Sequence, residues 1–380
     1  MRKIYLDHAA TTPVHPRAAE KMISVMNEIF GNPSSIHSFG RLARQVLDES
    51  RSIIARTLHA SDQEIVFTSG GTEADNLAVA GTAFANQSKG RHIITTAFEH
   101  HAVLHACQFL EKAGFKVTYL QPDAEGLIHA KDVEAALRED TILVSIMFVN
   151  NEVGTIQPIK EIGSLLADHQ AYFHTDAVQA YGTEEIHVKD LQVDLLSVTA
   201  HKINGPKGVG CLYIKNGSGI EPLLYGGEQE LKRRPGTENL VSICGFAEAA
   251  SIAAAERREK RRTYEKVKEA FIQTLESDNI DFTVNGSQKH AVPHVLNISF
   301  PGTEVESFLV NLDLAGIAAS SGSACTAGSI EPSHVLTAMF GEESERGRNS
   351  IRFSFGIDTT VEKAEEAAGK TADIVRRLIM

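Results

Sequence analysis

The sequence predicts an α/β protein with a mainly parallel mixed sheet in a large domain and a smaller α+β domain beside it. Short apolar runs rich in Val and Ile alternate with helical patterns through the first half of the chain. Polar or glycine-rich residues follow several of these runs, as expected at the carboxyl ends of parallel strands. The 380 residues exceed what one simple core accommodates. We expect residues 13–258 to form the large domain, and residues 1–12 with 259–380 to form the small one.

The expected elements follow one another in a regular order, identified by helical spacing or by short β-branched runs. The expected strands are Ile4–Leu6, the run from Glu64 to Gly70, Arg91–Thr96, Val117–Leu120, Ile142–Val149, Tyr172–Gln179, Val193–Val198, Val209–Ile214, Val295–Phe300, Ala315–Ala319 and Ser350–Phe355. The expected helices are Pro16–Phe30, a longer one from Ser38, one opened by Thr72, one after His100, Ala130–Leu137, Ala247–Leu275, Glu304–Leu312 and a last one near the C-terminus.

The turn after the strand that begins at Glu64 is a candidate anion site. Gly70 and Gly71 end the strand, and Thr72 opens a helix with Asp75 three residues on, a pattern similar to a capping box. Free backbone N–H groups at a helix N-terminus bind phosphate readily. The spacing matches neither a Walker loop nor a dinucleotide fingerprint, so no nucleotide is indicated, and a plain strand-to-helix turn is the alternative.

The stretch from Asp194 to Ile214 carries the lysine around which we expect the site to be organised. Its first strand ends near Thr199, a Gly-Pro turn follows, and the second strand returns antiparallel. A lysine held at such a strand end can lose water and, with a lowered pKa, form a Schiff base with an aldehyde, so Lys202 is a candidate nucleophile. An ordinary solvated loop lysine is the alternative. The other polar side chains at strand ends are Thr72, His100, Asn151, Asp176, Gln179, Thr199 and His201.

Cysteine and histidine residues suggest one reactive thiol and no metal site. Cys325 lies among glycine and small polar residues in the segment 320–329, which predicts an exposed, mobile loop. Cys211 and Cys244 have apolar neighbours, as structural thiols usually do. His101 and His105 lie four apart on one face of an expected helix, but no third ligand or HExxH motif accompanies them.

Composition restricts the partners and the location. The chain has 37 basic and 49 acidic residues and a formal charge of −12, which argues against a direct nucleic-acid or anionic-membrane binder. No apolar run reaches membrane-spanning length, and the N-terminus shows no signal-peptide pattern. The four cysteines form no CxxC pair, so we expect a reduced, cytoplasmic protein.

Nine segments, spread in order along essentially the whole chain, carry a family resemblance. They are LDHAATTP, FGNPSSIHSFG, FTSGGTEADNLA, FEHHAVL, VNNEVGTIQP, HTDAVQ, AHKINGPKGVG, SSGSACTAGS and IRFSFG. Together they resemble the cysteine desulfurases, pyridoxal-phosphate (PLP) enzymes of the class V aminotransferase branch. The cysteine segment is similar to that of the nitrogen-fixation and iron–sulfur-cluster type. The resemblance implies fold type I of the PLP-dependent transferases and a homodimer.

The same resemblance implies catalytic roles for residues at the strand ends. Lys202 would hold the cofactor as a Schiff base and act as general base, and His100 would stack on the ring and transfer protons. Asp176 would pair with the pyridine nitrogen, and Gln179 would bond the ring oxygen. Cys325 would attack the sulfur of L-cysteine, leaving a persulfide on the enzyme and releasing L-alanine.

Binding roles follow from the resemblance as well. Arg352 would clamp the substrate carboxylate, and Asn151 would lie beside both substrate and cofactor. Thr237 would reach the cofactor phosphate from a second subunit. The remaining phosphate ligands would be Gly71, Thr72, Thr199 and His201.

Partners and alternatives complete these expectations. The sulfur would pass to an iron–sulfur scaffold or a tRNA-thiolating enzyme, with no resident metal and only a transient iron–sulfur contact at Cys325. The chain stops at Met380, without the tail with which some members dock a scaffold, so other acceptors stay open. The residues Gly356–Asp358 replace a more usual Gly-Arg-Phe, and Gly71 stands where many members have alanine. A selenocysteine lyase or another class V enzyme is one alternative, and a non-enzymatic sulfur or metal carrier is another.

Overall fold

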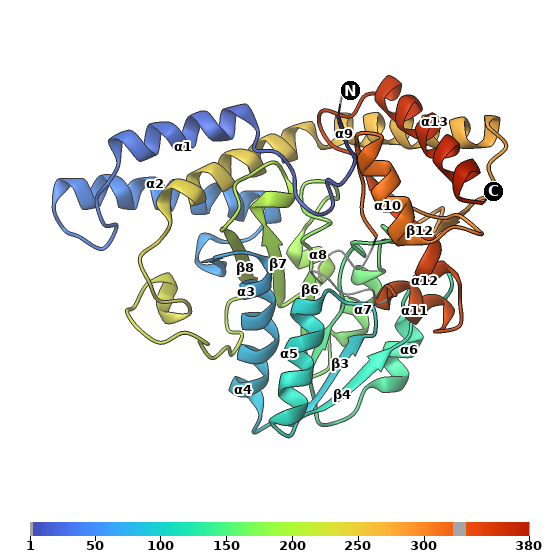
Figure 1. The fold of residues 1–380 in the computed structure, drawn as a ribbon. Helices are drawn as coiled ribbons and strands as arrows, with labels where there is room; N and C mark the ends of the chain where they lie inside the picture. The colour runs from blue at the N-terminus through green and yellow to red at the C-terminus, as the bar shows by residue number, and fades with distance from the viewer. Residues whose placement is uncertain (1–2, 322–331, 380) are drawn as a thin grey trace.

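A large mixed sheet forms the centre of the molecule in the computed structural model, which describes residues 3–321 and 332–379 (Figure 1). The order of its strands in the sheet is β2-β8-β7-β6-β5-β3-β4. The bounds are β2 Ile65–Thr68, β3 His92–Thr96, β4 Lys116–Leu120, β5 Thr141–Ser145, β6 Tyr172–Asp176, β7 Leu195–Thr199 and β8 Gly210–Ile214.

Strand direction brings the expected site residues to one edge of this sheet. The strands β3 to β7 pair in parallel, and β8 runs antiparallel to both β2 and β7. The carboxyl ends of β2 and of β3 to β7 therefore share one edge. This arrangement confirms the predicted mainly parallel mixed sheet and the antiparallel return after β7.

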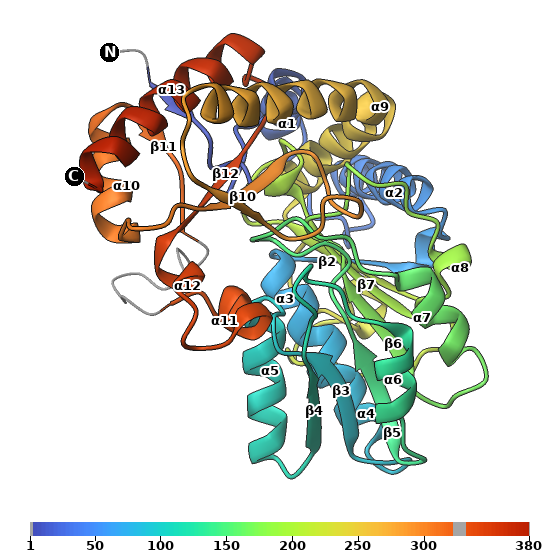
Figure 2. The same cartoon turned by 90° about the vertical axis from the view of Figure 1, so that its right-hand side faces the viewer.

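Helices cover both faces of the sheet. A continuous helical run on one face comprises α3 (Gly71–Asn76), a π-helical turn (Leu77–Gly81) and α4 (Thr82–Asn86), and α5 (His101–Lys112) packs beside it. On the opposite face lie α6 (Ala130–Ala136), α7 (Ile159–Leu166) and α8 (Val188–Leu191), as Figure 2 shows. Helix α7 was not expected, and β5 ends at Ser145, before the predicted Val149.

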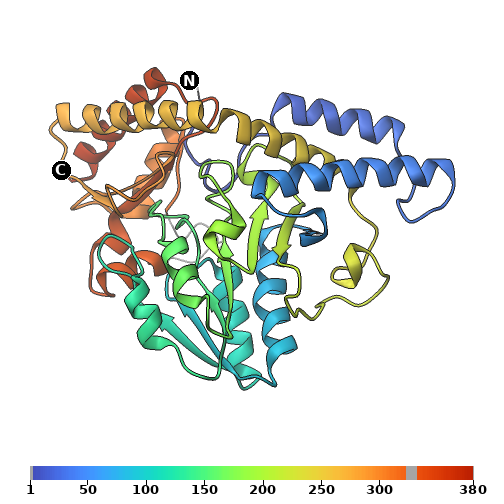
Figure 3. The ribbon, with the colours of Figure 1, turned by 180° about the vertical axis from the view of Figure 1, so that it is seen from behind.

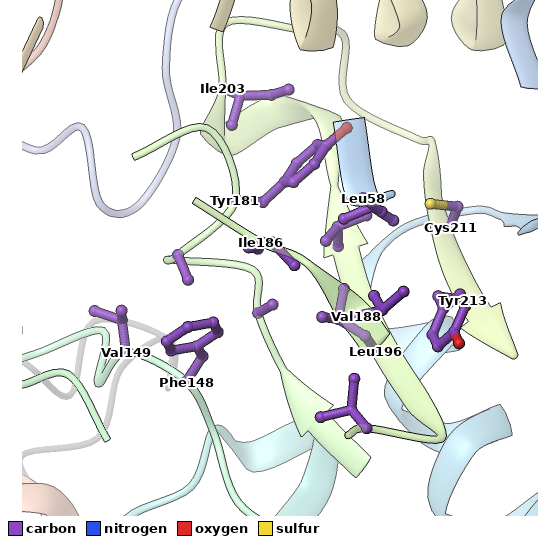
Figure 4. Packing of buried hydrophobic residues seen from close by; sticks show 14 of the residues in the cluster. Leu58, Phe148, Val149, Tyr181, Ile186, Val188, Leu196, Ile203, Cys211 and Tyr213 are labelled. Atoms are coloured by element: carbon purple, nitrogen blue, oxygen red, sulfur yellow. The ribbon is translucent and has the colours of Figure 1, made fainter. Parts of the chain in front are cut away.

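The alternation of side chains along the strands explains the two cores of this layer. Ile93 packs with α3 and α5, whereas the next residue, Ile94, faces the opposite cluster. Leu195 and Leu196 divide in the same way. Figure 4 shows part of the larger cluster, which includes Leu196 and Tyr181. A sheet buried on both faces needs such continuous apolar runs, which is why these strands could be recognised from sequence.

A second, separate core belongs to the elements near the chain ends. The strands β12 (Ser350–Ser354), β10 (Val295–Ser299) and β9 (Thr283–Asn285) form an antiparallel sheet, and β1 (Ile4–Tyr5) pairs in parallel with β11 (Ile317–Ala318). Their apolar side chains pack with α10 and α13. The bounds are α10 Val305–Leu314, α12 Arg346–Asn349 and α13 Val361–Leu378, whereas the buried apolar side chains of α11 (His334–Phe340) belong to the large cluster. This cluster agrees with a small α+β unit, while the boundary at residues 258 and 259 stays a prediction.

The long helix α9 (Leu240–Ser277) contributes to both cores. Its first half packs in the large cluster with α1 (Pro16–Glu28) and α2 (Ser38–Leu58), and its second half, with Phe271, packs in the small cluster. Figure 3 shows α1 and α2 running side by side next to α9. The helix begins before the predicted Ala247 because Asn239 caps it, accepting a hydrogen bond from the backbone N–H of Ser242.

Candidate functional site

A cavity of about 250 Å³ lies at the shared carboxyl edge of the sheet. Its wall is completed by β12 and by the N-terminal turn, which brings Ala9 and Ala10 to the site. The predicted site residues that line it are Gly71, Thr72, His100, Asn151, Asp176, Gln179, Thr199, His201, Lys202 and Arg352. Residues from far apart in the sequence therefore converge as the strand-end argument predicted, except for Arg352, which only the family resemblance had placed in the site.

Lys202 is held by the N-terminal turn. It ends a single 3₁₀ turn, Ala200–Lys202, that follows β7, and its side chain is half-buried. The Nζ donates hydrogen bonds to the backbone oxygens of Ala9 and Ala10, the latter at 2.8 Å. The amine is thus fixed at the cavity and is not an ordinary solvated lysine. Its lowered pKa stays a prediction.

Asp176, at the end of β6, is the buried carboxyl of the cavity. Its side chain is 5 % exposed, and Oδ1 accepts a hydrogen bond from the backbone N–H of Val178 at 2.9 Å. Burial raises the pKa of Asp176 to about 6, although that hydrogen bond and the charge of Lys202 act in the opposite direction. A cation placed beside this carboxyl would therefore be strongly favoured.

Two further buried carboxyls, Asp75 and Glu99, are close enough to Asp176 for its charge to raise their pKa values, and neither was predicted from the sequence as a site residue. Asp75 lines the cavity and is fully buried, and burial together with the charge of Asp176 raises its pKa well above the usual range. Glu99 accepts hydrogen bonds from the backbone N–H of Met147 and the hydroxyl of Thr96, and burial raises its pKa to about 8. The position of Glu99, directly before His100 at a strand end, was the signal that could have identified it.

The two histidines of the cavity are neutral near pH 7. His100 caps α5 with its Nδ1, which accepts a hydrogen bond from the backbone N–H of Ala102 at 3.1 Å. Burial and the neighbouring charge of Lys202 lower the pKa of His100 to about 4. The same two causes lower the pKa of His201 to about 4, and its Nδ1 lies 3.2 Å from the hydroxyl of Thr11.

The turn after β2 differs from the predicted capping box. The helix begins at Gly71 with Gly70 as its N-cap, so the residue three positions later is Glu73 and not Asp75. Glu73 accepts the backbone N–H of Ser69 at 2.9 Å, outside the cavity, whereas Asp75 points inward. The capping prediction was wrong because the helix starts earlier than Thr72. The N–H groups of the first helical turn still face no earlier helical carbonyl, as an anion site requires.

Arg352, in β12, supplies a buried guanidinium opposite the sheet. It is 4 % exposed, and it donates to the backbone oxygen of Asn151 at 2.9 Å and to Oδ1 of Asp7 at 3.0 Å. Its Nε and the Oδ1 of Asn151 are buried without a hydrogen-bond partner among the described residues. Both residues line the cavity, where a polar ligand could satisfy these atoms.

Two predicted site residues are not in the cavity. Thr237 is exposed, in the segment between β8 and α9, and does not line it. Cys325 lies outside the described residues. Within the ranges 3–321 and 332–379, no group of three or more His, Cys, Asp or Glu side chains is arranged to hold a metal, and no helix is long and apolar enough to cross a membrane.

Comparison with known proteins agrees with this geometry. The family model "Aminotransferase class-V" matches residues 4–366. The chain is 59 % identical over 378 residues to the "Putative cysteine desulfurase IscS 1" of Bacillus subtilis, with all of both chains covered. It is 47 % identical to the "Cysteine desulfurase IscS" of Dictyoglomus turgidum, covering all of this chain and 95 % of that one.

Solved structures show the same relationship. A "NifS-like protein" superposes with a TM-score of 0.93 at 35 % identity, with 99 % of this chain and 100 % of the other covered. A structure described as "SspA in complex with cysteine" superposes with a TM-score of 0.82 at 38 % identity, with 93 % and 99 % covered. The fold is therefore the PLP-dependent fold type I, and the chain belongs to the class-V aminotransferase family and, within it, to the PLP-dependent cysteine desulfurases.

Proposed function

We propose that the chain removes sulfur from L-cysteine with PLP bound in this cavity, giving L-alanine and a persulfide on Cys325. The observation that carries the proposal is the convergence of Lys202, Asp176, His100 and Arg352 on one cavity. These residues supply an amine nucleophile, a buried carboxylate, a neutral imidazole ring and a carboxylate-binding guanidinium. A sulfur carrier without a cofactor would need none of this arrangement.

The chemistry of the donor set fits PLP. The turn at Gly71 and Thr72, with Thr199 and His201, offers hydrogen-bond donors and a helix N-terminus for the phosphate. Strand β6, which pairs with β7, ends at Asp176, and the buried carboxylate of this residue would be stabilised by a protonated ring nitrogen.

The protein's own groups would then hold the cofactor and move one proton. PLP supplies a ring that withdraws electrons from the substrate Cα. Lys202 would be the covalent attachment point, and its amine would take the Cα proton and return it after sulfur has left. His100 is uncharged near pH 7, so its ring can lie against the cofactor without adding a second cation beside Lys202. Gln179 would donate to the ring oxygen once released from the backbone oxygen of Ala9, which it now contacts at 3.0 Å.

The substrate carboxylate would bind at the unsatisfied Nε of Arg352 in the opposite wall. Arg352 already has one nitrogen fixed by Asp7 and another by the backbone of Asn151, so its planar group is oriented in advance. Its Nε lacks a partner among the described residues and can serve a carboxylate oxygen. The thiolate of Cys325 would attack the substrate sulfur, and the broken C–S bond would leave its electron pair on carbon.

Exposed apolar side chains support a homodimer in which Thr237 reaches the partner's cofactor phosphate. Large apolar residues are exposed on α1, on α2, between these helices and in the segment after β8. They are Ile23, Met26, Phe30, Ile36, Phe39, Leu42, Leu224, Tyr225 and Leu231. Such a concentration is unusual on a monomer and typical of an interface. The cysteines at 107, 211 and 244 are free and buried, which is consistent with a reduced cytoplasmic setting. A sulfur-accepting protein completes the proposed set of partners.

The test is Cys325→Ser, assayed for alanine and sulfide from free L-cysteine under reducing conditions. A serine hydroxyl is a poor nucleophile toward divalent sulfur, so we expect alanine formation to fall at least about 100-fold while the cofactor spectrum still responds to cysteine. Cys107→Ser, at a buried thiol in α5, is the matched control. Alanine and sulfide released at the parent rate by Cys325→Ser would instead favour a selenocysteine-lyase-like enzyme.

A further inference from the structure

The carboxylate of Glu73 connects two parts of the protein that would bind different cofactor molecules. Its Oε2 accepts the backbone N–H of Ser69 at 2.9 Å, in the turn that leads to Gly71 and Thr72. The same carboxylate accepts Nε of Arg234 at 2.7 Å and Nη2 of Arg234 at 3.3 Å. Arg234 lies three residues before Thr237. One side chain thus links the turn of the cavity to the segment that carries Thr237.

This segment is held in place although it is outside the cavity. Glu230 is buried, accepts both terminal nitrogens of Arg51 at 2.6 and 2.8 Å, and accepts the backbone N–H of Phe67 in β2 at 2.8 Å. Gln229 accepts the backbone N–H of Gly236 at 3.0 Å. In Figure 1 the segment, drawn in yellow-green, runs on the α3 side of the molecule, away from α10 and α13.

Its backbone also shows that it is fixed. Glu230, Leu231 and Lys232 have positive φ angles of 46°, 57° and 65°. Three consecutive residues other than glycine in the left-handed region are unfavourable, and they persist only where surrounding contacts impose them. Leu231 is nevertheless 61 % exposed, so these contacts do not serve to bury it. The backbone of the segment is therefore fixed while its surface faces outward.

The Glu73–Arg234 pair is partly shielded and well formed. The two side chains are 21 % and 23 % exposed. Burial acts to raise the pKa of Glu73, but the hydrogen bonds from Arg234 and Ser69 outweigh it and lower the pKa. Lys232 and Glu228 on the same segment also form an ion pair, at 2.9 Å, but their side chains are 70 % and 78 % exposed. This solvent-exposed pair therefore contrasts with the shielded pair of Glu73 and Arg234.

We propose that Glu73 and Arg234 are positioning residues that couple cofactor binding at the two sites of the dimer. A phosphate bound at Gly71 and Thr72 would protect the turn, and with it Glu73, against local opening, and the contact with Arg234 would extend that protection to Thr237 at the partner's site. Binding of the first cofactor would thereby strengthen binding of the second. This inference rests on the proposed dimer and its use of PLP.

The experiment is an equilibrium titration of the dimeric apoenzyme with PLP, followed by cofactor fluorescence. The variants are Glu73→Gln, which keeps an oxygen for the N–H of Ser69, and Arg234→Gln. The matched control is Glu228→Gln, the same change in the exposed pair. A coupling of about fivefold between two sites corresponds to a Hill coefficient of about 1.4 in the parent. We expect that value for the parent and for Glu228→Gln, and a value near 1 for both test variants.

Two accompanying measurements distinguish a specific coupling role of Glu73 and Arg234 from a general loss of structure in the variants. The double variant should bind PLP like either single variant, because both changes break the same link. Sedimentation should show that every variant stays dimeric. If Arg234→Gln does not fold, Arg234→Lys, which keeps the charge but loses the two-pronged contact, takes its place.

Several outcomes would overturn the inference. They are a Hill coefficient of 1 in the parent, unchanged cooperativity in Glu73→Gln, an equal effect of Glu228→Gln, or loss of the dimer in the test variants. Failure of the proposed function is detected separately, by alanine and sulfide release from Cys325→Ser at the parent rate, because a selenocysteine-lyase-like enzyme would still bind PLP and could still show this coupling.

Discussion

Replacing Asp176 with Asn tests the electrostatics of the cavity most directly. The change keeps the shape and leaves an oxygen to accept the backbone N–H of Val178, so the fold should survive. It removes the buried negative charge that would stabilise a protonated ring nitrogen. The side chain is only 5 % exposed, so little solvent is present to replace that charge.

The expected loss is large in turnover and small in binding. Removing one preorganised electrostatic group from a dry site typically lowers kcat about 100- to 1,000-fold, or about 3–4 kcal/mol. The change would leave the proposed phosphate contacts at Thr72, Thr199 and His201 and the proposed attachment at Lys202 unaltered. We therefore expect cofactor affinity to fall by no more than about tenfold, which is about 1.4 kcal/mol.

The assay measures alanine formation at saturating L-cysteine and, separately, the concentration of PLP that half-saturates the apoenzyme. Asp194→Asn is the control, since Asp194 also accepts a backbone N–H, from Phe173 at 2.9 Å, but precedes β7 at the other end of the sheet. A kcat within about threefold of the parent in Asp176→Asn, less than 0.7 kcal/mol, would refute the reasoning.

Two further predictions concern other groups of the cavity. Lys202→Ala should stay folded and dimeric but lose the borohydride-reducible link to PLP; a cofactor still fixed by borohydride would show that another lysine holds it. Glu99, whose pKa is raised to about 8 by burial, should make the apoprotein less stable as the pH rises above about 4.5 toward 8, because the folded form retains a proton that the unfolded form loses. Between pH 5 and 7 the free energy of unfolding, measured by urea unfolding, should fall by about 2.5 kcal/mol through this group. Glu99→Gln should remove that part of the slope, and an unchanged slope would contradict the assignment.

Much of the site could be predicted because parallel strands place their carboxyl ends at one edge. Asp176, Thr199 and His100 needed only the recognition of an apolar run and of the polar residue that follows it. The predicted capping role of Asp75 was wrong for a local reason. The spacing from Thr72 to Asp75 fits a capping box only if the helix begins after Thr72, and two glycines allowed it to begin earlier.

Contacts between distant segments could not be predicted in the same way. Glu230 and Arg51 are 179 residues apart, and neither has neighbours in sequence that indicate a buried pair. Nothing in the spacing of the residues of α9 shows that its two halves pack in different cores. Such pairings depend on how complete elements pack, and local patterns do not encode that packing.

The contact between Asp7 and Arg352, near the two ends of the chain, has a consequence for how the protein folds during synthesis. Asp7 and Arg352, which orient each other in the cavity wall, are 345 residues apart. A ribosome that adds about 5–20 residues per second reaches position 352 roughly 20–70 s after initiation. The seven-stranded sheet is already complete once β8 has emerged, whereas the wall that carries Arg352 is not. A nascent chain therefore carries its lysine and phosphate turn for most of synthesis without the group that would hold an amino acid, and it acquires that group only when translation is nearly over.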